Sequence, residues 1–184
     1  MAASSRQPKT YEDYLNTPND GRKYELIDGE IVLSAPPTIN HQRLVGRLAR
    51  LLGEIADSIQ GDEAFLGPVA VSLDPANTLE PDVVYRKRES ASVVEARRIQ
   101  GVPELIIEVI SPGSASRDQI RKRAIYESAG VPEYWIVDPA RKTLLALQLR
   151  DGRYEELTPD GSRLASDILP AFAVDLTALF KNLT

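Results

Sequence analysis

The run LIIEVI, residues 105–110, places Glu108 between aliphatic residues on both sides. A short, continuous apolar run of this kind is typical of a strand that is buried on both faces of a sheet. An ionised carboxylate left unpaired in such a strand is costly, so it is usually paired with a cation or bound to a metal. We therefore expect Glu108 to have a specific partner, and this requirement constrains both the fold and the chemistry of the chain.

Length and composition predict a single domain over residues 11–184, preceded by a short disordered lead over residues 1–10. The chain has 184 residues, of which 42% are hydrophobic and 27% are charged, and it has no cysteine. No apolar run approaches the roughly 18 residues needed to cross a bilayer. The first residues also lack the apolar stretch of a signal peptide. These features favour a cytoplasmic protein without a membrane partner.

The single histidine and the absence of cysteine restrict the metals that the chain can bind. A zinc site built on cysteines, or on two or three histidines, is excluded. Any bound metal must be held mainly by carboxylate and carbonyl oxygens, which suit magnesium, manganese or calcium. The net charge of −5 argues against a protein that coats DNA, but it leaves room for an enzyme with a local basic groove.

The order of predicted elements favours an α/β (α+β) fold with a central mixed sheet, flanking helices and an N-terminal β-hairpin. Leucines and isoleucines at helical spacing predict a long helix, with Asn40 as its cap. A second helix between two apolar strands predicts a crossover between parallel strands. The expected elements are hairpins over 24–34 and 143–157, strands over 64–73, 82–85, 104–110 and 133–138, helices over 41–59, 117–128 and 175–181, a charged connector with a helical turn over 86–103, and a loop over 111–116.

Asp82 is the first candidate partner for Glu108, because it opens the strand DVVY directly after a proline. If the two strands pair, both carboxylates reach one face of the sheet. Two neighbouring carboxylates repel each other unless a cation or a proton intervenes. A divalent metal resolves this repulsion, and the Val109 carbonyl and waters would complete its ligands. Lys122, on the following helix, would bring a positive charge to a phosphate near the metal.

Several segments together resemble the Uma-type family of restriction-endonuclease-like proteins, long catalogued as a domain of unknown function. The matching segments span roughly residues 11–158 and are YELIDGEIVLSAPP, His41 at the start of a leucine-rich helix, PDVVY, LIIEVISPGSASRD, Lys122 and YESAGVPEYWIVDP. Asp82 after Pro81, followed by Glu108, also resembles the wider PD-(D/E)XK nuclease superfamily. In that superfamily the lysine follows the second acid by two residues, where this chain has Ile110. In the Uma-type pattern the lysine lies on the next helix, at Lys122.

The resemblance implies a restriction-endonuclease-like fold and metal binding by Asp82 and Glu108. It also implies that Lys122, Glu25 and His41 belong to the site, with Mg²⁺ or Mn²⁺ as cofactor. Alternatives remain for each residue. Glu108 could form a buried salt bridge with a basic residue of the next helix. Lys122 could be a solvated helix residue, and Glu25 and His41 could be structural.

Two functions from different classes follow from these expectations. The first is a magnesium-dependent endonuclease that hydrolyses phosphodiester bonds, with duplex DNA as the substrate implied by the resemblance. A homodimer is expected for such an enzyme, because cutting two strands requires two sites. The second is a non-catalytic module for nucleic-acid binding or assembly that keeps the nuclease fold. Hydrolysis of another phosphate ester is a further possibility, but no glycine-rich Walker loop is present.

Overall fold

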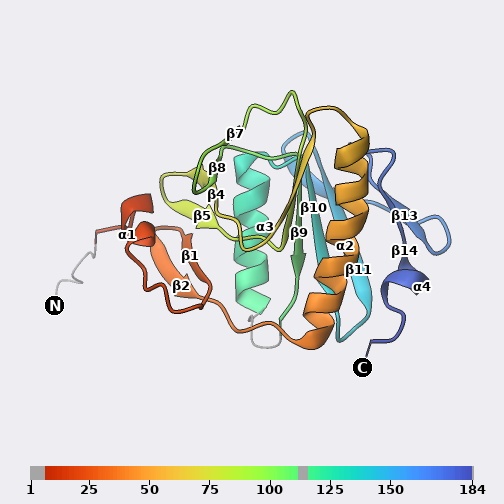
Figure 1. The fold of residues 1–184 in the computed structure, drawn as a ribbon, viewed down its shortest axis with the longest axis horizontal. Coiled ribbons are helices and arrows are strands. Elements are labelled where there is room, and N and C mark those ends of the chain that lie inside the picture. Colours follow the sequence, from red (N-terminus) through yellow and green to blue (C-terminus); the bar gives the residue numbers. More distant parts are fainter. Residues whose placement is uncertain (1–6, 112–115, 184) are drawn as a thin grey trace.

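Two six-stranded sheets form the scaffold of the protein in this computed structural model, which describes residues 7–111 and 116–183 (Figure 1). The first, here called the central sheet, has the strand order β12-β11-β10-β9-β6-β3. β9 and β10 run parallel, and the other neighbouring strands are antiparallel. This arrangement confirms the predicted α/β fold with a central mixed sheet. Its strands are β3 Glu63–Leu66, β6 Val83–Arg86, β9 Leu105–Val109, β10 Glu133–Asp138, β11 Thr143–Arg150 and β12 Arg153–Glu156.

The second sheet, here called the outer sheet, has the order β2-β1-β5-β4-β8-β7, and the sequence predicts only its hairpin of β1 and β2. The single strand expected over residues 64–73 is wrong, because these residues are divided between β3 of the central sheet and β4 of the outer sheet. The helical turn expected within residues 86–103 is wrong, because this connector forms β7 and β8 instead. β8 pairs in parallel with β4, which buries Ile99 against Val71. The strands of the outer sheet are β1 Tyr24–Ile27, β2 Glu30–Leu33, β4 Val71–Asp74, β5 Asn77–Leu79, β7 Val93–Val94 and β8 Ile99–Gln100, and a small third sheet pairs β13 Arg163–Ala165 with β14 Ala173–Asp175.

The two long helices lie on opposite faces of the central sheet (Figure 1). Leu48 of α2 shares a buried cluster with Ile107 of β9. On the other face, Tyr126 of α3 shares a cluster with Ile106 of β9 and Ile27 of β1, so α3 lies between the two large sheets. Within the described residues, no helix has both the length and the apolar character needed to span a membrane. The helices are α1 Tyr11–Leu15, α2 Ile39–Ser58, α3 Ser116–Ala129 and α4 Leu176–Leu179.

The long helix α2 is capped by Thr38, not by Asn40 as predicted. The hydroxyl oxygen of Thr38 accepts a hydrogen bond from the backbone N–H of His41 at 3.2 Å. Asn40 lies within the first turn because the helix begins at Ile39. This start places His41 in the first turn of the helix. The buried hydrophobic side chains follow the predicted helical spacing and are Leu44, Val45, Leu48, Leu52 and Ala56.

The helix α3 connects the parallel strands β9 and β10, as predicted for the crossover. It has no continuous apolar stripe, because its buried side carries Lys122 beside Ile125 and Tyr126. Gly130, with φ of +88°, follows the helix as expected. The loop expected over residues 111–116 falls largely on residues 112–115, which lie outside the described residues.

Both predicted hairpins are confirmed, and each turns at an Asp-Gly pair. β1 and β2 are joined by residues 28–29, and β11 and β12 by residues 151–152. All four turn residues have positive φ, between +48° and +78°. Two-residue hairpin turns of this kind require positive φ at both positions, which aspartate and glycine tolerate.

Part of the expected N-terminal lead packs on the first hairpin. The backbone N–H of Lys9 donates to the carbonyl of Gly29 at 2.8 Å. Thr10 caps α1 and exchanges hydrogen bonds with Asp13. Residues 1–6 of the lead lie outside the described residues.

The C-terminal segment, which carries β13, β14 and α4, closes the core on the α2 face. Trp135 of β10 stacks on Phe172, with ring centroids 4.7 Å apart. Its indole N–H donates to Oε1 of Glu133 at 2.6 Å. Oε2 of Glu133 accepts from the hydroxyl of Ser166 at 3.0 Å and from the backbone N–H groups of residues 167–168 at 3.2 and 3.3 Å. One buried carboxylate therefore ties this segment to the central sheet.

Candidate active site

Asp82 and Glu108 lie opposite each other across two neighbouring strands. In the antiparallel pairing of β6 with β9, Val83 is the register partner of Ile107. Continuing this register by one residue places Asp82, which directly precedes β6, opposite Glu108. Directly opposed residues of an antiparallel pair point to the same face of the sheet. The sequence prediction that these strands pair is therefore confirmed. Glu108 contacts α3, whereas Asp82 contacts His41 of α2.

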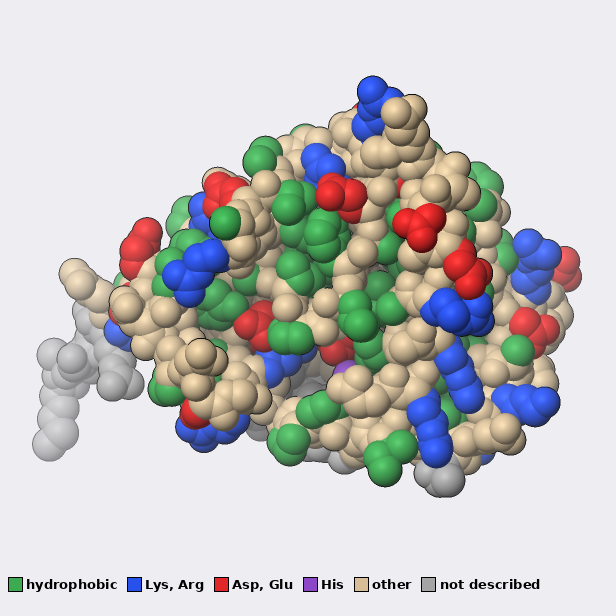
Figure 2. All heavy atoms as spheres, in the orientation of Figure 1, with side chains coloured by type: hydrophobic (Ala, Val, Ile, Leu, Met, Phe, Trp, Pro, Cys, Tyr) green, Lys and Arg blue, Asp and Glu red, His purple; other side chains and the backbone are tan. Residues whose placement is uncertain are grey.

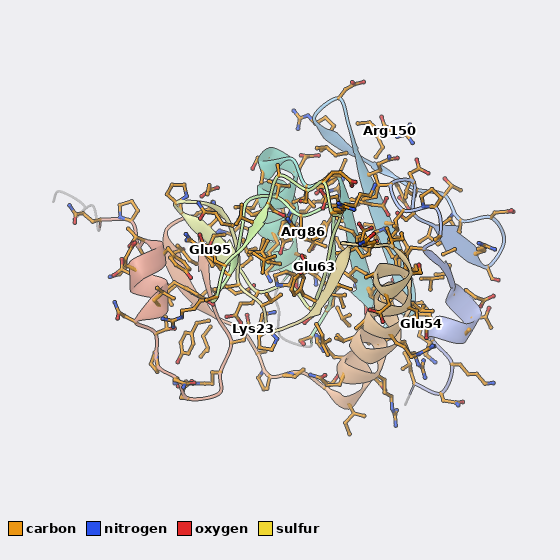
Figure 3. All side chains as sticks on the ribbon, turned by 45° about the horizontal axis from the view of Figure 1, so that its top comes forward. Lys23, Glu54, Glu63, Arg86, Glu95 and Arg150 are labelled. Carbon is orange, nitrogen blue, oxygen red and sulfur yellow. The ribbon has the colours of Figure 1, made fainter. Side chains whose placement is uncertain are left out.

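One oxygen of Asp82 is held by two donors. Oδ2 accepts from the backbone N–H of Val109 at 2.7 Å and lies 3.2 Å from Nε2 of His41. Nζ of Lys23, just before β1, lies 3.9 Å from Oδ1 (Figure 3). Burial acts to raise the pKa of Asp82, but the imidazole hydrogen bond, the lysine charge and the backbone N–H together lower it below its ordinary value. This carboxylate is therefore ionised at neutral pH.

Glu108 has two side-chain partners, and both come from α3. Nζ of Lys122 and the hydroxyl of Tyr126 each donate to Oε1 at 2.9 Å. Burial raises the pKa of Glu108; the charge of Lys122 opposes this shift, and the carboxylates of Glu25 and Asp82 add to it. The net shift is upward because burial outweighs the positive charges of Lys122 and Lys23. Among the described residues, Oε2 of Glu108 has no hydrogen-bond partner.

Lys122 lies between two buried glutamates. Its Nζ donates to Oε1 of Glu25 at 2.8 Å and to Oε1 of Glu108 at 2.9 Å. Burial acts to lower the pKa of Lys122, but the two carboxylates raise it above its ordinary value, so the ammonium remains charged. Glu25 also accepts from the backbone N–H of Glu80 at 2.8 Å and from the hydroxyl of Ser34 at 2.9 Å. The salt bridge weighed as an alternative for Glu108 is therefore present.

Four of the five predicted site residues line one cavity of about 640 Å³, here called the carboxylate cavity. They are Asp82, Glu108, Lys122 and His41. Figure 2 shows the single histidine at the bottom of a hollow, with acidic and basic side chains at its edge. Glu25 does not line the cavity and is only 2% exposed. Its carboxylate accepts a hydrogen bond from Nζ of Lys122 but does not itself reach the cavity, so it does not face a molecule bound there.

The donor atoms around the cavity fit a hard divalent cation. Within residues 7–111 and 116–183, no group of three or more histidine, aspartate or glutamate side chains could hold a metal by itself. Magnesium needs fewer protein ligands, because waters and substrate phosphates usually complete its octahedron. Oδ1 of Asp82 and Oε2 of Glu108 are available, since neither has a hydrogen-bond partner among the described residues. The Val109 carbonyl lies on the same strand edge as its N–H, which points at Asp82.

The sequence profile of a family described as "Putative restriction endonuclease" matches residues 11–178. The chain belongs to the Uma2 family. This result confirms the resemblance found in the sequence. An uncharacterized protein of Synechocystis sp. (strain ATCC 27184 / PCC 6803 / Kazusa), sll1609, is 29% identical to this Uma2 chain over 142 residues, which are 75% of this chain and 79% of that protein.

A solved structure supports the same fold for this Uma2 chain. It is the crystal structure of a "putative nuclease belonging to DUF820" from Anabaena variabilis ATCC 29413. The two structures are similar with a TM-score of 0.78 and 18% sequence identity, over 96% of this chain and 100% of that chain. The predicted restriction-endonuclease-like fold is therefore confirmed.

Two site contacts of this Uma2 chain were missed at the sequence level although a signal exists. Tyr126 follows Lys122 by four positions on α3, so helical spacing places both on one face. Lys23 precedes Glu25 by two positions, and residues two apart on an extended segment share a face. Helical spacing thus predicts that Tyr126 lies beside Lys122, and strand spacing predicts that Lys23 lies on the same face as Glu25.

Gly67 is a third contact that the sequence analysis missed. Its backbone lies close to the backbone of Pro81 and Asp82. Its N–H donates to the carbonyl of Asp82 at 2.8 Å. A Cβ at Gly67 would lie 2.5 Å from the carbonyl oxygen of Pro81 and 3.2 Å from Cα of Asp82. Only a glycine allows the segment after β3 to approach the residues that carry the carboxylate. The sequence shows a Gly-Pro pair there but does not show what it contacts.

Proposed function

We propose that this Uma2 member is a magnesium-dependent endonuclease that hydrolyses DNA phosphodiester bonds. The supporting observation is the opposition of Asp82 and Glu108 across β6 and β9, in a cavity that Lys122 also lines. Each carboxylate keeps one oxygen without a hydrogen-bond partner among the described residues. Paired carboxylate oxygens beside a lysine suit metal-assisted hydrolysis of a phosphate ester.

Asp82 and Glu108 would hold the magnesium or manganese ion, with the Val109 carbonyl as a further ligand. A bound divalent ion supplies positive charge that stabilises the phosphate and lowers the pKa of a coordinated water. The upward shift in the pKa of Glu108, caused first by burial, supports this assignment. A cation at the two available oxygens would compensate both burial and the repulsion between the carboxylates.

Lys122 would contact the scissile phosphate directly. An ammonium has three N–H donors, and Glu25 and Glu108 take two of them. The third is left for a non-bridging phosphate oxygen or for the attacking water. Because the two glutamates fix the position of Nζ, this donor is oriented before the substrate binds.

Glu25 and His41 are proposed as positioning residues. Glu25 holds Lys122 from outside the cavity. His41 holds Asp82 through Nε2, while its Nδ1 is buried and has no hydrogen-bond partner among the described residues. A protonated imidazole would leave a buried Nδ1–H donor unsatisfied. The neutral tautomer with its proton on Nε2 therefore fits the site.

We propose duplex DNA as the substrate and a cytoplasmic homodimer as the active form. One carboxylate cavity can cut one strand at a time, so a double-strand break requires a second copy. A monomer would nick. Either outcome is visible as relaxed or linear plasmid, so the same assay tests the oligomeric part of this proposal.

A non-catalytic nucleic-acid-binding module is the second candidate, and one observation favours it. The contacts of Lys122 with Glu25 and Glu108 already provide Glu108 with a cation. A buried ion network of this kind can serve the fold alone. In that case DNA would bind without metal and would not be cut.

The two candidates are separated by incubating plasmid and single-stranded DNA with magnesium, manganese or EDTA. The nuclease requires metal-dependent nicking that is lost in Asp82→Asn. Asp57→Asn makes the same change on the exposed side of α2 and should nick normally. No nicking by the wild type, together with a magnesium titration heat that Asp82→Asn leaves unchanged, would overturn the proposal. A metal-independent gel shift of intact DNA would then support the binding module.

A further inference from the structure

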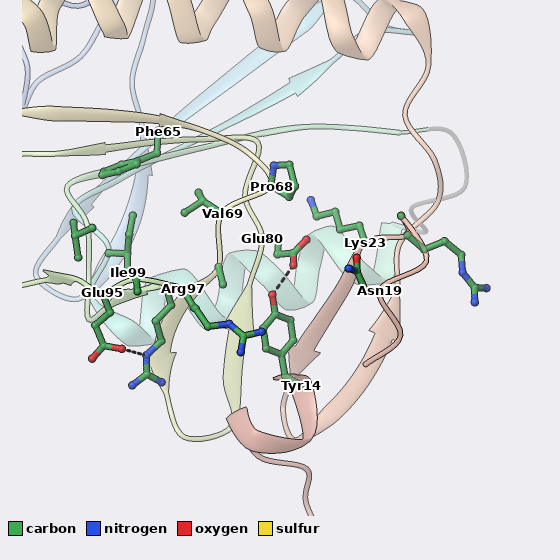
Figure 4. Close-up of a pocket in the computed structure, with 16 residues that line it drawn as sticks. Tyr14, Asn19, Lys23, Phe65, Pro68, Val69, Glu80, Glu95, Arg97 and Ile99 are labelled. Atoms are coloured by element: carbon green, nitrogen blue, oxygen red, sulfur yellow. Dashed lines mark hydrogen bonds and ion pairs between the residues drawn. The ribbon is translucent and has the colours of Figure 1, made fainter. Parts of the chain in front are cut away.

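A second cavity of about 590 Å³, here called the side cavity, opens beside the outer sheet. Figure 4 shows the Tyr14 hydroxyl directed at Glu80, with Lys23 close by and Phe65 and Val69 on the other side. Small-molecule sites typically have volumes of roughly 300–1,000 Å³, and a nucleotide unit fits within this range. The proposed nuclease chemistry does not use this cavity.

The side cavity adjoins the carboxylate cavity. The two share five lining residues: Gly21, Arg22, Lys23, Pro68 and Glu80. Lys23 connects them electrostatically, because its Nζ lies 3.9 Å from Asp82 and its charge also acts on Glu80. A phosphate bound at Asp82 would therefore lie beside residues that also line the side cavity.

The walls of the side cavity combine an apolar surface with the carboxylates of Glu80 and Glu95. Phe65 and Val69 pack against the buried cluster of Ile99 and form the apolar part. At the other side, the Tyr14 hydroxyl donates to Oε1 of Glu80 at 2.5 Å. Oε2 of Glu80 has no hydrogen-bond partner among the described residues. A planar apolar ring with a donor at its edge matches this surface.

Basic residues at the rim add a place for the phosphate backbone. Arg22 is paired with Asp20, and Arg98 is paired with Glu95 at 2.8 Å. Arg97 also lines the cavity, is exposed, and makes no ion pair among the described residues. An unpaired arginine beside an apolar cavity suits a phosphate attached to a base.

We propose that the side cavity receives the base of the nucleotide next to the scissile phosphate, and that it favours bases with an exocyclic amino group. This inference rests on the proposed nuclease function. Glu80 would accept from the amino group, as acidic side chains accept from N4 of cytosine. Thymine carries a carbonyl oxygen, O4, where cytosine carries its amino group, and this oxygen would repel the carboxylate. A base in this cavity is unstacked, so a duplex substrate would bind with this base flipped out of the helix.

Binding of fluorescein-labelled oligo(dC), oligo(dT) and an abasic oligomer of equal length tests this proposal. Anisotropy is measured with calcium in place of magnesium, and gels confirm that the oligomers remain intact. Oligo(dC) and oligo(dT) are a pyrimidine pair that differs at C4, where cytosine has an amino group and thymine a carbonyl, and in the C5 methyl of thymine. We expect oligo(dC) to bind at least about tenfold more tightly than oligo(dT), as one hydrogen bond to a charged acceptor predicts. The abasic oligomer should bind most weakly.

Glu80→Gln keeps the shape of the side chain and can still accept from Tyr14 through its oxygen. Its free end then becomes an N–H donor, so the preference for oligo(dC) should disappear or reverse. Glu54→Gln makes the same change on α2, outside both cavities (Figure 3), and should keep the preference. Equal affinity of the wild type for all three oligomers would overturn the proposal, even if a variant failed to fold. An unchanged preference in Glu80→Gln would also overturn it.

Plasmid nicking is measured on the same preparations to separate the two proposals. Nicking without any base preference in binding would reject the base site and leave the nuclease. A base preference that Glu80→Gln removes, without nicking under any metal, would reject the nuclease and leave a base-binding cavity.

Discussion

The backbone N–H of Val109 donates to Oδ2 of Asp82 at 2.7 Å, so the residue that follows Glu108 fixes the carboxylate that faces it. This contact follows from the strand register, because Asp82 stands opposite Glu108. It also orients the carboxylate, since one oxygen is engaged and Oδ1 is left without a hydrogen bond among the described residues. The pairing of β6 with β9 therefore sets both the distance and the direction of the proposed metal ligands.

Replacing Gly67 by alanine should disturb the site through the backbone. The new Cβ would lie 2.5 Å from the Pro81 carbonyl, so the segment that carries Asp82 must shift. We expect a loss of about 1–3 kcal/mol in the free energy of unfolding. Nicking should fall about tenfold or more, because small misplacements of catalytic groups are costly. Urea unfolding and plasmid nicking measure the two effects.

Gly46→Ala is the matched control for this change. Gly46 is an exposed residue inside α2, and a Cβ there meets no atom within 4 Å. Alanine should stabilise the helix by about 0.5–1 kcal/mol and leave nicking unchanged. A Gly67→Ala protein with full stability and full activity would show that the close approach to Asp82 does not matter.

The charge of Glu25 should make stability depend on pH in a defined window. Burial acts to raise the pKa of Glu25, but Lys122 and the other donors lower it below its ordinary value of 4.5. A carboxylate with a lowered folded-state pKa binds fewer protons in the folded state than in the unfolded state. Its stabilising contribution is therefore complete above about pH 4.5 and is lost as the pH falls through the lowered value.

The measurement compares wild type with Glu25→Gln in urea at several pH values. Glutamine cannot ionise, so the variant should be less stable at pH 7, and the gap should narrow as the pH falls below 4.5. A gap that stays constant across this range would mean that the charge of Glu25 does not contribute to its interaction with Lys122.

Local pattern predicted the parts of the fold that depend on nearby residues. The Asp-Gly turns, the leucine spacing of α2 and the crossover through α3 are all contained within short stretches of sequence. The opposition of Asp82 and Glu108 was also predictable, because one connector joins adjacent strands and period-2 alternation then fixes the shared face.

The outer sheet could not be predicted in the same way. Its hairpin of β1 and β2 was predicted from the Asp-Gly turn, but β5, β7 and β8 have only two or three residues, too few for alternation to be recognised. They pair with distant partners, as when Leu26 meets Thr78 and Val71 meets Ile99. Glu25 is brought to Lys122 by the position of β1 in this sheet. The sequence therefore identified Glu25 as a candidate but could not show that it lies outside the cavity.

Removing the carboxylate of Glu133 should detach the C-terminal segment from the central sheet. Glu133→Met would leave the Trp135 indole N–H, the Ser166 hydroxyl and two backbone N–H groups without their acceptor. Each buried unsatisfied donor costs about 1–3 kcal/mol, so we expect a total loss of roughly 3 kcal/mol or more. Hydrogen exchange should increase at residues 166–168. Glu156→Met, on the exposed side of β12, should show neither effect.

The hydroxyl of Tyr126 should tune Glu108 without touching the substrate. It donates to Oε1 of Glu108 at 2.9 Å, and a hydrogen bond to the ionised form of a carboxylate lowers its pKa. Burial already raises the pKa of Glu108 above its ordinary value. Tyr126→Phe should therefore raise this pKa further. Since the metal binds the ionised form, the acid limb of the pH–rate profile should move to higher pH. Nicking at a pH well above this limb should be nearly unchanged.

Tyr154→Phe separates this effect from a general loss of stability. The Tyr154 hydroxyl donates to the carbonyl of Val131 at 3.0 Å, in the same buried cluster as Tyr126 but away from the carboxylates. Both variants lose one buried hydrogen bond, so their unfolding free energies should fall by similar amounts, about 1 kcal/mol. Only Tyr126→Phe should shift the pH profile. Equal profiles for the two variants would show that Glu108 titrates independently of Tyr126, and that its protonation is governed by burial, Lys122 and the neighbouring carboxylates alone.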